Sequence, residues 1–77
     1  MSETPTDGLR TVVVPHMPIE LCQLLKFAAL TASGGEAKQA ISEGRVQVNG
    51  AIESIKRRKL APGDRVTFAG QTIVVAS

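Results

Sequence analysis

The chain of 77 residues, 43% of them hydrophobic, predicts one small domain with a small core. Its single cysteine excludes an internal disulfide, and with only one histidine beside it a zinc site made by this chain is disfavoured. No apolar run approaches the roughly 20 residues of a membrane span, and the N-terminus lacks the apolar segment of a signal peptide. These features predict a cytoplasmic protein with no membrane segment, no metal and no cofactor.

The charge is distributed unevenly along the chain. The total is +2, from nine Lys and Arg against seven Asp and Glu, but Glu3 and Asp7 both lie in the polar, turn-rich first eight residues. Without residues 1–8 the remainder carries +4. We predict a flexible tail over residues 1–10 and a single domain over residues 11–77.

The first predicted elements are a strand and a helix. Thr11–Val14 is β-branched, which favours a strand or an extended arm, and Pro18 is suited to a helix start. From Ile19 to Leu30 apolar residues recur at helical spacing, and the predicted buried stripe consists of Leu21, Leu24, Leu25 and Ala28. Phe27 and Phe68, the only aromatic residues, lie within apolar patterns and are predicted to be core residues.

A second helix is predicted from Gly34 to Glu43. Ser33 followed three residues later by Glu36 matches a capping box at its start, and Gly44 is typical of the position just after a helix. The predicted buried side of this helix consists of Ala37, Ala40 and Ile41. The small alanines indicate close packing of this helix on its neighbour.

After Gly44 the apolar residues follow the period of two that is typical of strands. The predicted strands are Arg45–Val48, Ala51–Ser54, Arg65–Phe68 and Gln71–Val75. Asn49-Gly50 favours a tight hairpin turn, and Pro62–Asp64 marks another turn. Two short packed helices followed by a small, mostly antiparallel sheet make an α+β fold.

Groups that suit phosphate occur in two places. Four consecutive residues are basic, namely Lys56, Arg57, Arg58 and Lys59. This cluster is a candidate phosphate-binding patch or, alternatively, a solvated loop. At the predicted start of the second helix, Ser33, Gly34 and Gly35 expose backbone N–H groups that suit a phosphate. Lys26 on the first helix is a candidate to extend such a surface.

Several segments resemble the S-four RNA-binding domain, also called the alpha-L RNA-binding motif, namely Leu24–Leu30, Ser33–Lys38, Ile41–Gly50 and Lys59–Asp64. The resemblance covers about residues 19–75. It is carried by the combination of a helix, a Gly-x-Val-x-Val-Asn-Gly hairpin and a Pro-Gly-Asp turn. The chain is most similar to the small stand-alone bacterial members of the family, the YbcJ-like proteins.

In that family the second helix and the following hairpin form the surface that faces RNA. The resemblance therefore implies RNA contacts by Ser33, Lys38, Gln39, Arg45, Gln47 and Asn49. Many members carry an arginine in the turn before the second helix, where this chain has Gly34-Gly35. Because this arginine is missing, we expect the backbone amides of this turn and the Lys38 side chain to contribute more to RNA binding.

Together these observations predict a non-enzymatic protein that binds structured RNA. Ribosomal RNA and transfer RNA are the expected classes, the ribosome is a further candidate partner, and the protein is expected to be a monomer. No paired carboxylates, phosphate loop or nucleophile–base pair indicates a catalytic site. The alternative is a protein-interaction adaptor that docks an acidic partner on the same basic face.

Overall fold

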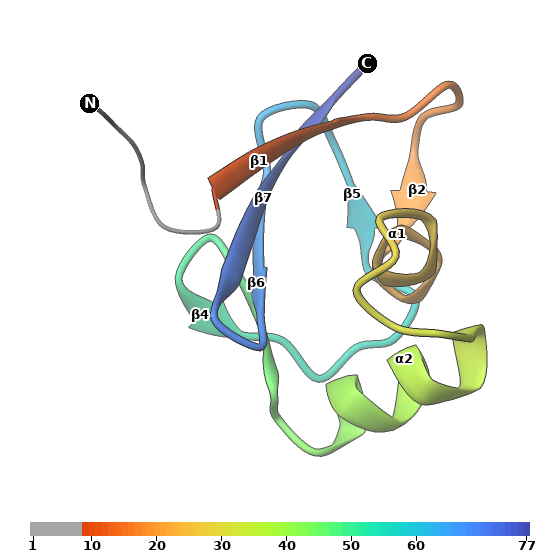
Figure 1. Ribbon diagram of the computed structural model, residues 1–77, viewed down its shortest axis with the longest axis vertical. Coiled ribbons are helices and arrows are strands. Elements are labelled where there is room, and N and C mark those ends of the chain that lie inside the picture. The colour runs from red at the N-terminus through yellow and green to blue at the C-terminus, as the bar shows by residue number, and fades with distance from the viewer. Residues whose placement is uncertain (1–8) are drawn as a thin grey trace.

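The computed structural model describes residues 9–77, which form two helices and seven short strands (Figure 1). In chain order the elements are β1 (Leu9–Val13), β2 (Ile19–Glu20), α1 (Leu21–Phe27), α2 (Gly34–Ser42), β3 (Val46–Val48), β4 (Ala51–Ile52), β5 (Lys59–Leu60), β6 (Arg65–Phe68) and β7 (Gln71–Ala76). Strands β1, β7, β6 and β4 lie on one side of the molecule, and the two helices with β2 and β5 lie on the other, as Figure 1 shows. The predicted α+β fold is confirmed.

Five strands form the large sheet in the order β1-β7-β6-β3-β4. Every neighbouring pair is antiparallel except β1 and β7, which are parallel. The first strand begins two residues earlier than predicted, because Leu9 and Arg10 pair with Thr72 and Ile73 of β7. Of the tail predicted over residues 1–10, the first eight residues lie outside the described part of the chain.

The core lies between one face of this sheet and the facing sides of the two helices. The sheet contributes alternate residues such as Val46, Val66 and Ile73, each fully buried. The predicted helical stripes are confirmed, since all of their members are buried: Leu21, Leu24, Leu25, Ala28, Ala37, Ala40 and Ile41. Cys22 is a buried free thiol beside them.

The first helix is shorter than predicted at both ends. Ile19 and Glu20 form β2, which pairs with β5 in a second, two-stranded sheet, so Pro18 precedes a strand rather than a helix. At the other end Ala29 adopts a left-handed conformation with φ 59°. Its N–H donates to Lys26 at 3.0 Å, and the N–H of Leu30 donates to the carbonyl of Leu25 at 2.9 Å. These two bonds form a Schellman motif that ends the helix.

The second helix and the tight turns follow their sequence signals. Gly44, with φ 73°, ends α2 in another Schellman motif, and Asn49-Gly50 forms the hairpin turn with both φ angles positive. The capping box forms only in part. Ser33 Oγ accepts from the N–H of Glu36 at 3.2 Å, but the Glu36 carboxylate accepts from Ala32, one residue before Ser33.

The two phenylalanines differ from each other. Phe68 is 8% exposed and belongs to the core, as predicted. Phe27 is 51% exposed, so its prediction as a core residue is wrong. Successive residues of a helix are about 100° apart. Phe27 comes two residues after the buried Leu25 and directly after the exposed Lys26, so it lies outside the buried stripe of α1. Within residues 9–77, no helix has the length and apolar character needed to cross a membrane.

Candidate nucleic-acid interface

Three cationic side chains surround a depression of about 340 Å³ beside the two helices. Lys26 comes from α1, Lys38 from α2 and Arg57 from the turn before β5. The remaining lining residues are Glu20, Cys22, Gln23 and Gly34. We refer to this site as the basic depression. Its lining carries three cations against one carboxylate, a balance that favours an anionic ligand.

Backbone hydrogen bonds place the predicted basic cluster next to the first helix. The N–H of Leu21 donates to the carbonyl of Arg58 at 2.8 Å, and the N–H of Cys22 donates to that of Lys56 at 3.1 Å. These two N–H groups belong to the first turn of α1 and have no acceptor inside the helix. The loop satisfies them, and in doing so it fixes Arg57 at the edge of the basic depression.

The cations of the basic depression are available to a ligand. Within the described residues, Lys26 and Lys38 are exposed and make no ion pair. Arg57 Nε lies 3.3 Å from Glu20 Oε2, with 80% of the arginine side chain exposed. Such surface pairs contribute at most about 1 kcal/mol, so a phosphate can replace the carboxylate at little cost.

The start of the second helix contributes less than predicted. Gly34 lines the basic depression, and its N–H has no acceptor within the helix. Ser33 instead uses its hydroxyl to cap the helix, and the carboxylate of Glu36 lies against the same turn. This carboxylate weakens the attraction of the helix terminus for an anion.

Gln39 and Arg45 lie in a different hollow from Lys38. Gly34 and Lys38, four residues apart, share one side of α2, whereas Gln39 lines a hollow of about 290 Å³ together with Glu36 and Arg45. Glu43 accepts from Gln39 at 3.2 Å and pairs with Arg45 at 3.3 Å. The carboxylates offset the positive charge of this second hollow.

Arg45 also has an aromatic neighbour. Its guanidinium carbon lies 5.6 Å from the centre of the Phe68 ring, a cation–π arrangement. This contact and the Glu43 pair hold the arginine against the protein, although 61% of its side chain is exposed. Arg45 is therefore less free than Lys38 to follow a ligand.

Gln47 lies on the face of the sheet that is turned away from the helices. It alternates with the buried Val46 and Val48 along β3, and its neighbours across the sheet are Ile52 and Thr67. The structure therefore does not bring Gln47 to the basic depression.

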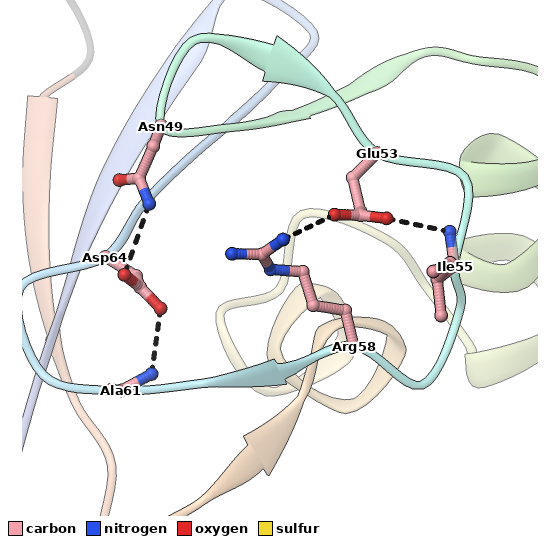
Figure 2. A network of polar contacts seen from close by, with 6 residues as sticks. All are labelled: Asn49, Glu53, Ile55, Arg58, Ala61 and Asp64. Carbon is pink, nitrogen blue, oxygen red and sulfur yellow. Dashed lines mark hydrogen bonds and ion pairs between the residues drawn. The ribbon is translucent and has the colours of Figure 1, made fainter.

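Asn49 and Arg58 belong to contacts that hold the fold together, as Figure 2 shows. Asn49 Nδ2 donates to Asp64 Oδ1 at 3.2 Å, and Asn49 Oδ1 accepts from the N–H of Arg65 at 3.0 Å. Arg58 Nη1 donates to Glu53 Oε1 at 2.8 Å. We call Asn49, Glu53, Arg58 and Asp64 the polar network.

The charge state of Glu53 reflects its place in this network. The N–H of Ile55 donates to Glu53 Oε2 at 3.1 Å, and Arg58 donates to the other oxygen. These hydrogen bonds, with the backbone N–H of Ile55 contributing most, lower the pKa of the Glu53 carboxyl below its ordinary value. Glu53 therefore stays ionised and keeps its hold on Arg58.

The four consecutive basic residues thus separate into different roles. Arg57 reaches the basic depression, Arg58 belongs to the polar network, and Lys56 and Lys59 are exposed beside them. Arg10 was not singled out from the sequence, yet it donates to the carbonyl of Ala28 just after α1. No sequence signal connects these two residues, which are 18 positions apart.

The lining of the basic depression suits anions rather than cations. Within residues 9–77, no three His, Cys, Asp or Glu side chains come together to hold a metal ion. The arrangement offers ammonium and guanidinium donors on a concave surface. Such donors bind the oxygens of phosphates and carboxylates.

Comparisons with known proteins agree with this architecture. Residues 13–76 match the family model of the S4 domain. YbcJ of Escherichia coli is 47% identical over 62 residues, which cover 80% of this chain and 89% of that protein. The solution structure of E. coli YbcJ, described as having an alpha-L motif involved in RNA binding, matches with a TM-score of 0.68 and 38% identity, over 100% of this chain and 96% of that one.

A second group of relatives is much larger. The tyrosine–tRNA ligase of Burkholderia thailandensis is 37% identical over 65 residues, which cover 84% of this chain but 16% of the ligase. The similarity to these enzymes is thus confined to one small part of them. With its helices, hairpin and sheet all accounted for by the match, the chain belongs to the S4 domain family.

Proposed function

We propose that this protein binds structured RNA, of the ribosomal or transfer RNA class, through the basic depression and performs no catalysis. One observation carries the proposal: Lys26, Lys38 and Arg57 come from three separate segments and surround one depression. Sequence proximity does not explain this grouping, because the three residues are distributed over more than 30 positions of the chain.

The chemistry of the site favours a folded RNA over a free strand. Double-stranded RNA is recognised mainly by its shape, its phosphates and its 2′-hydroxyls, because its deep major groove excludes side chains. The two packed helices and the anchored loop fix the backbone positions of the three cations, which suits phosphates at fixed positions. We therefore assign them the neutralisation of phosphates in a structured segment.

The relatives support the same class of ligand. The E. coli structure is described in terms of a motif involved in RNA binding, and the ligases, by their name, act on transfer RNA. The shared segment is a small fraction of each ligase, which supports a binding role rather than a catalytic one.

A salt titration tests the proposal. Binding of a hairpin RNA is measured by filter retention at several salt concentrations. If the three cations neutralise three phosphates, the logarithm of the association constant falls against the logarithm of salt with a slope of roughly −2 to −3. Undetectable or salt-independent binding contradicts the proposal.

A matched pair of variants locates the site. Lys38→Glu reverses a charge in the basic depression, while Arg65→Glu reverses an exposed charge on the far face of the sheet. Both change the net charge equally. Loss of binding in Lys38→Glu alone supports the basic depression, and equal loss in both contradicts it. Retention of a protein partner after nuclease treatment, with no RNA binding, favours the adaptor alternative.

A further inference from the structure

We propose that a hollow next to the basic depression holds one unpaired nucleotide of the bound RNA, with its base stacked on Phe27. This inference rests on the proposed RNA binding. The hollow measures about 510 Å³, within the ~300–1,000 Å³ range of small-ligand sites. Its exposed lining consists of Pro15, His16, Pro18, Gln23, Lys26 and Phe27.

The exposure of Phe27 is the first observation behind this proposal. The aromatic ring is 51% exposed, although α1 buries Leu21, Leu24 and Leu25 completely. Phe27 lies four positions after Gln23, and residues at that spacing share one side of a helix. One exposed side of α1 thus presents an amide, an ammonium group and an aromatic ring together.

The continuity of the two hollows is the second observation. Gln23 and Lys26 line both the basic depression and the hollow at Phe27. A chain of nucleotides whose phosphates lie in the basic depression therefore passes Lys26 before it reaches the Phe27 ring. No such continuity links the basic depression to the exposed Ile52, which lies on the edge strand β4.

The chemistry of an unpaired nucleotide matches this lining. Its flat base stacks on an aromatic ring, its polar edge forms hydrogen bonds, and its phosphate pairs with a cation. Phe27 and the rings of Pro15 and Pro18 supply apolar walls. Gln23 Oε1 accepts from the N–H of Glu20 at 3.2 Å, so the amide nitrogen of Gln23 is the group that donates to a base edge, and Lys26 supplies the cation. A paired base is already stacked within its helix, so the hollow selects an unpaired one.

The test compares two blunt-ended RNA duplexes that share one stem sequence, the second with a single-nucleotide bulge. Filter binding is measured for the unchanged protein, Phe27→Ala, Phe27→Trp and Ile52→Ala. We expect Phe27→Ala to weaken binding of the bulged RNA by about five- to hundredfold, the range of one lost stacking contact. Binding of the continuous stem stays unchanged. Phe27→Trp keeps the bulge preference, and Ile52→Ala, which removes an even more exposed apolar side chain elsewhere, changes the binding of neither RNA.

Nuclear magnetic resonance gives a second, direct measurement. The protein has two phenylalanines, so the ring signals of Phe27 are compared with those of the buried Phe68 in the same sample. Stacking shifts the Phe27 ring signals when the bulged RNA is added and leaves those of Phe68 nearly unchanged. Addition of the continuous stem shifts the ring signals of neither phenylalanine.

The outcomes separate this inference from the proposed function. Equal affinity for the two RNAs, with no effect of Phe27→Ala and no Phe27 shift, overturns the nucleotide hollow while RNA binding stands. An equal loss for both RNAs in Phe27→Ala also overturns it, because the ring then acts without regard to the bulge. Failure of the unchanged protein to bind either RNA overturns the proposed function and this inference with it.

Discussion

Arg57 and Arg58 are neighbours in the chain but belong to two different regions. In the basic depression, the Arg57 side chain is 80% exposed, and its Nε lies 3.3 Å from Glu20 Oε2. In the polar network, the Arg58 side chain is 41% exposed, and its Nη1 lies 2.8 Å from Glu53 Oε1. The backbone N–H of Ile55 donates to the other oxygen of Glu53 (Figure 2). The first arginine is available to a ligand, whereas the second holds the loop.

The difference shows that a run of basic residues does not have one function. The polar network fastens the hairpin, the loop before β5 and the turn before β6, which all lie within residues 49–64. Backbone hydrogen bonds from Leu21 and Cys22, independent of the Arg58 side chain, keep Arg57 at the basic depression. We therefore expect changes in the basic depression to alter RNA binding and changes in the polar network to alter stability.

The largest expected effect comes from removing both lysines of the basic depression. Lys26→Ala with Lys38→Ala should lower RNA affinity about a hundredfold, since each charge-assisted contact contributes roughly 1.5 kcal/mol, or about tenfold. The salt slope should become shallower by about 1.5 to 2. Filter binding measures both. The unfolding midpoint should stay in place because both side chains are exposed. Unchanged affinity would show that the depression is not the RNA site.

The next effect concerns the hairpin end of the polar network. Asn49→Ala should lower the free energy of unfolding by about 2 kcal/mol, from lost hydrogen bonds and from an alanine forced to φ 52°. Denaturant unfolding measures the loss. Asn49→Gly removes the same hydrogen bonds but suits the backbone, so it should lose less. If the two variants were equally destabilised, the backbone conformation would not contribute.

The two neighbouring arginines allow the most direct comparison. Arg58→Ala should lower the free energy of unfolding by about 0.5–1 kcal/mol, the upper range for partly exposed pairs, and leave RNA affinity unchanged. Arg57→Ala should leave stability unchanged and weaken RNA binding. Thermal unfolding and filter binding of both variants check this crossed pattern. The separation of roles fails if either variant alters both properties to the same degree.

The smallest effect is a pH dependence within the polar network. The lowered pKa of Glu53 means that its stabilisation is fully present above the ordinary glutamate pKa of about 4.3. This stabilisation is lost as the pH falls through the folded-state value. The unchanged protein should therefore be more stable than Glu53→Gln at neutral pH, and the difference should shrink in acid. Denaturant unfolding of both proteins across this range measures it. A constant difference would show that ionisation of Glu53 contributes nothing.

Local signals predicted much of the fold. The spacing of Leu21, Leu24 and Leu25 places them on one side of a helix whatever surrounds it. Gly44 and Asn49-Gly50 favour left-handed backbone, and the structure has it there. The same signal was missing at the end of α1, where the left-handed residue is Ala29, and the helix was accordingly predicted too long.

Less of the candidate site could be predicted from the sequence. Lys38 and Arg45 were expected on one surface, but they line hollows on different sides of α2. The sequence predicts a turn at Asn49, and the family resemblance implies an RNA contact there. In the structure the side chain holds the turn by binding Asp64 and the backbone of Arg65. Phe27 was expected in the core because the apolar pattern did not define the edge of the buried stripe.

The sequence by itself determined the helices, the hairpin, the α+β class and a positive charge outside the first eight residues. These features depend on periodicity and on turn residues, which act over a few neighbouring positions. Only the tertiary structure decided which charges meet. Packing of α1 on α2, and the hydrogen bonds of Leu21 and Cys22 to the loop before β5, place Lys26, Lys38 and Arg57 around one depression. Contacts between segments so far apart depend on the packed core, because no local pattern encodes the distance between two elements.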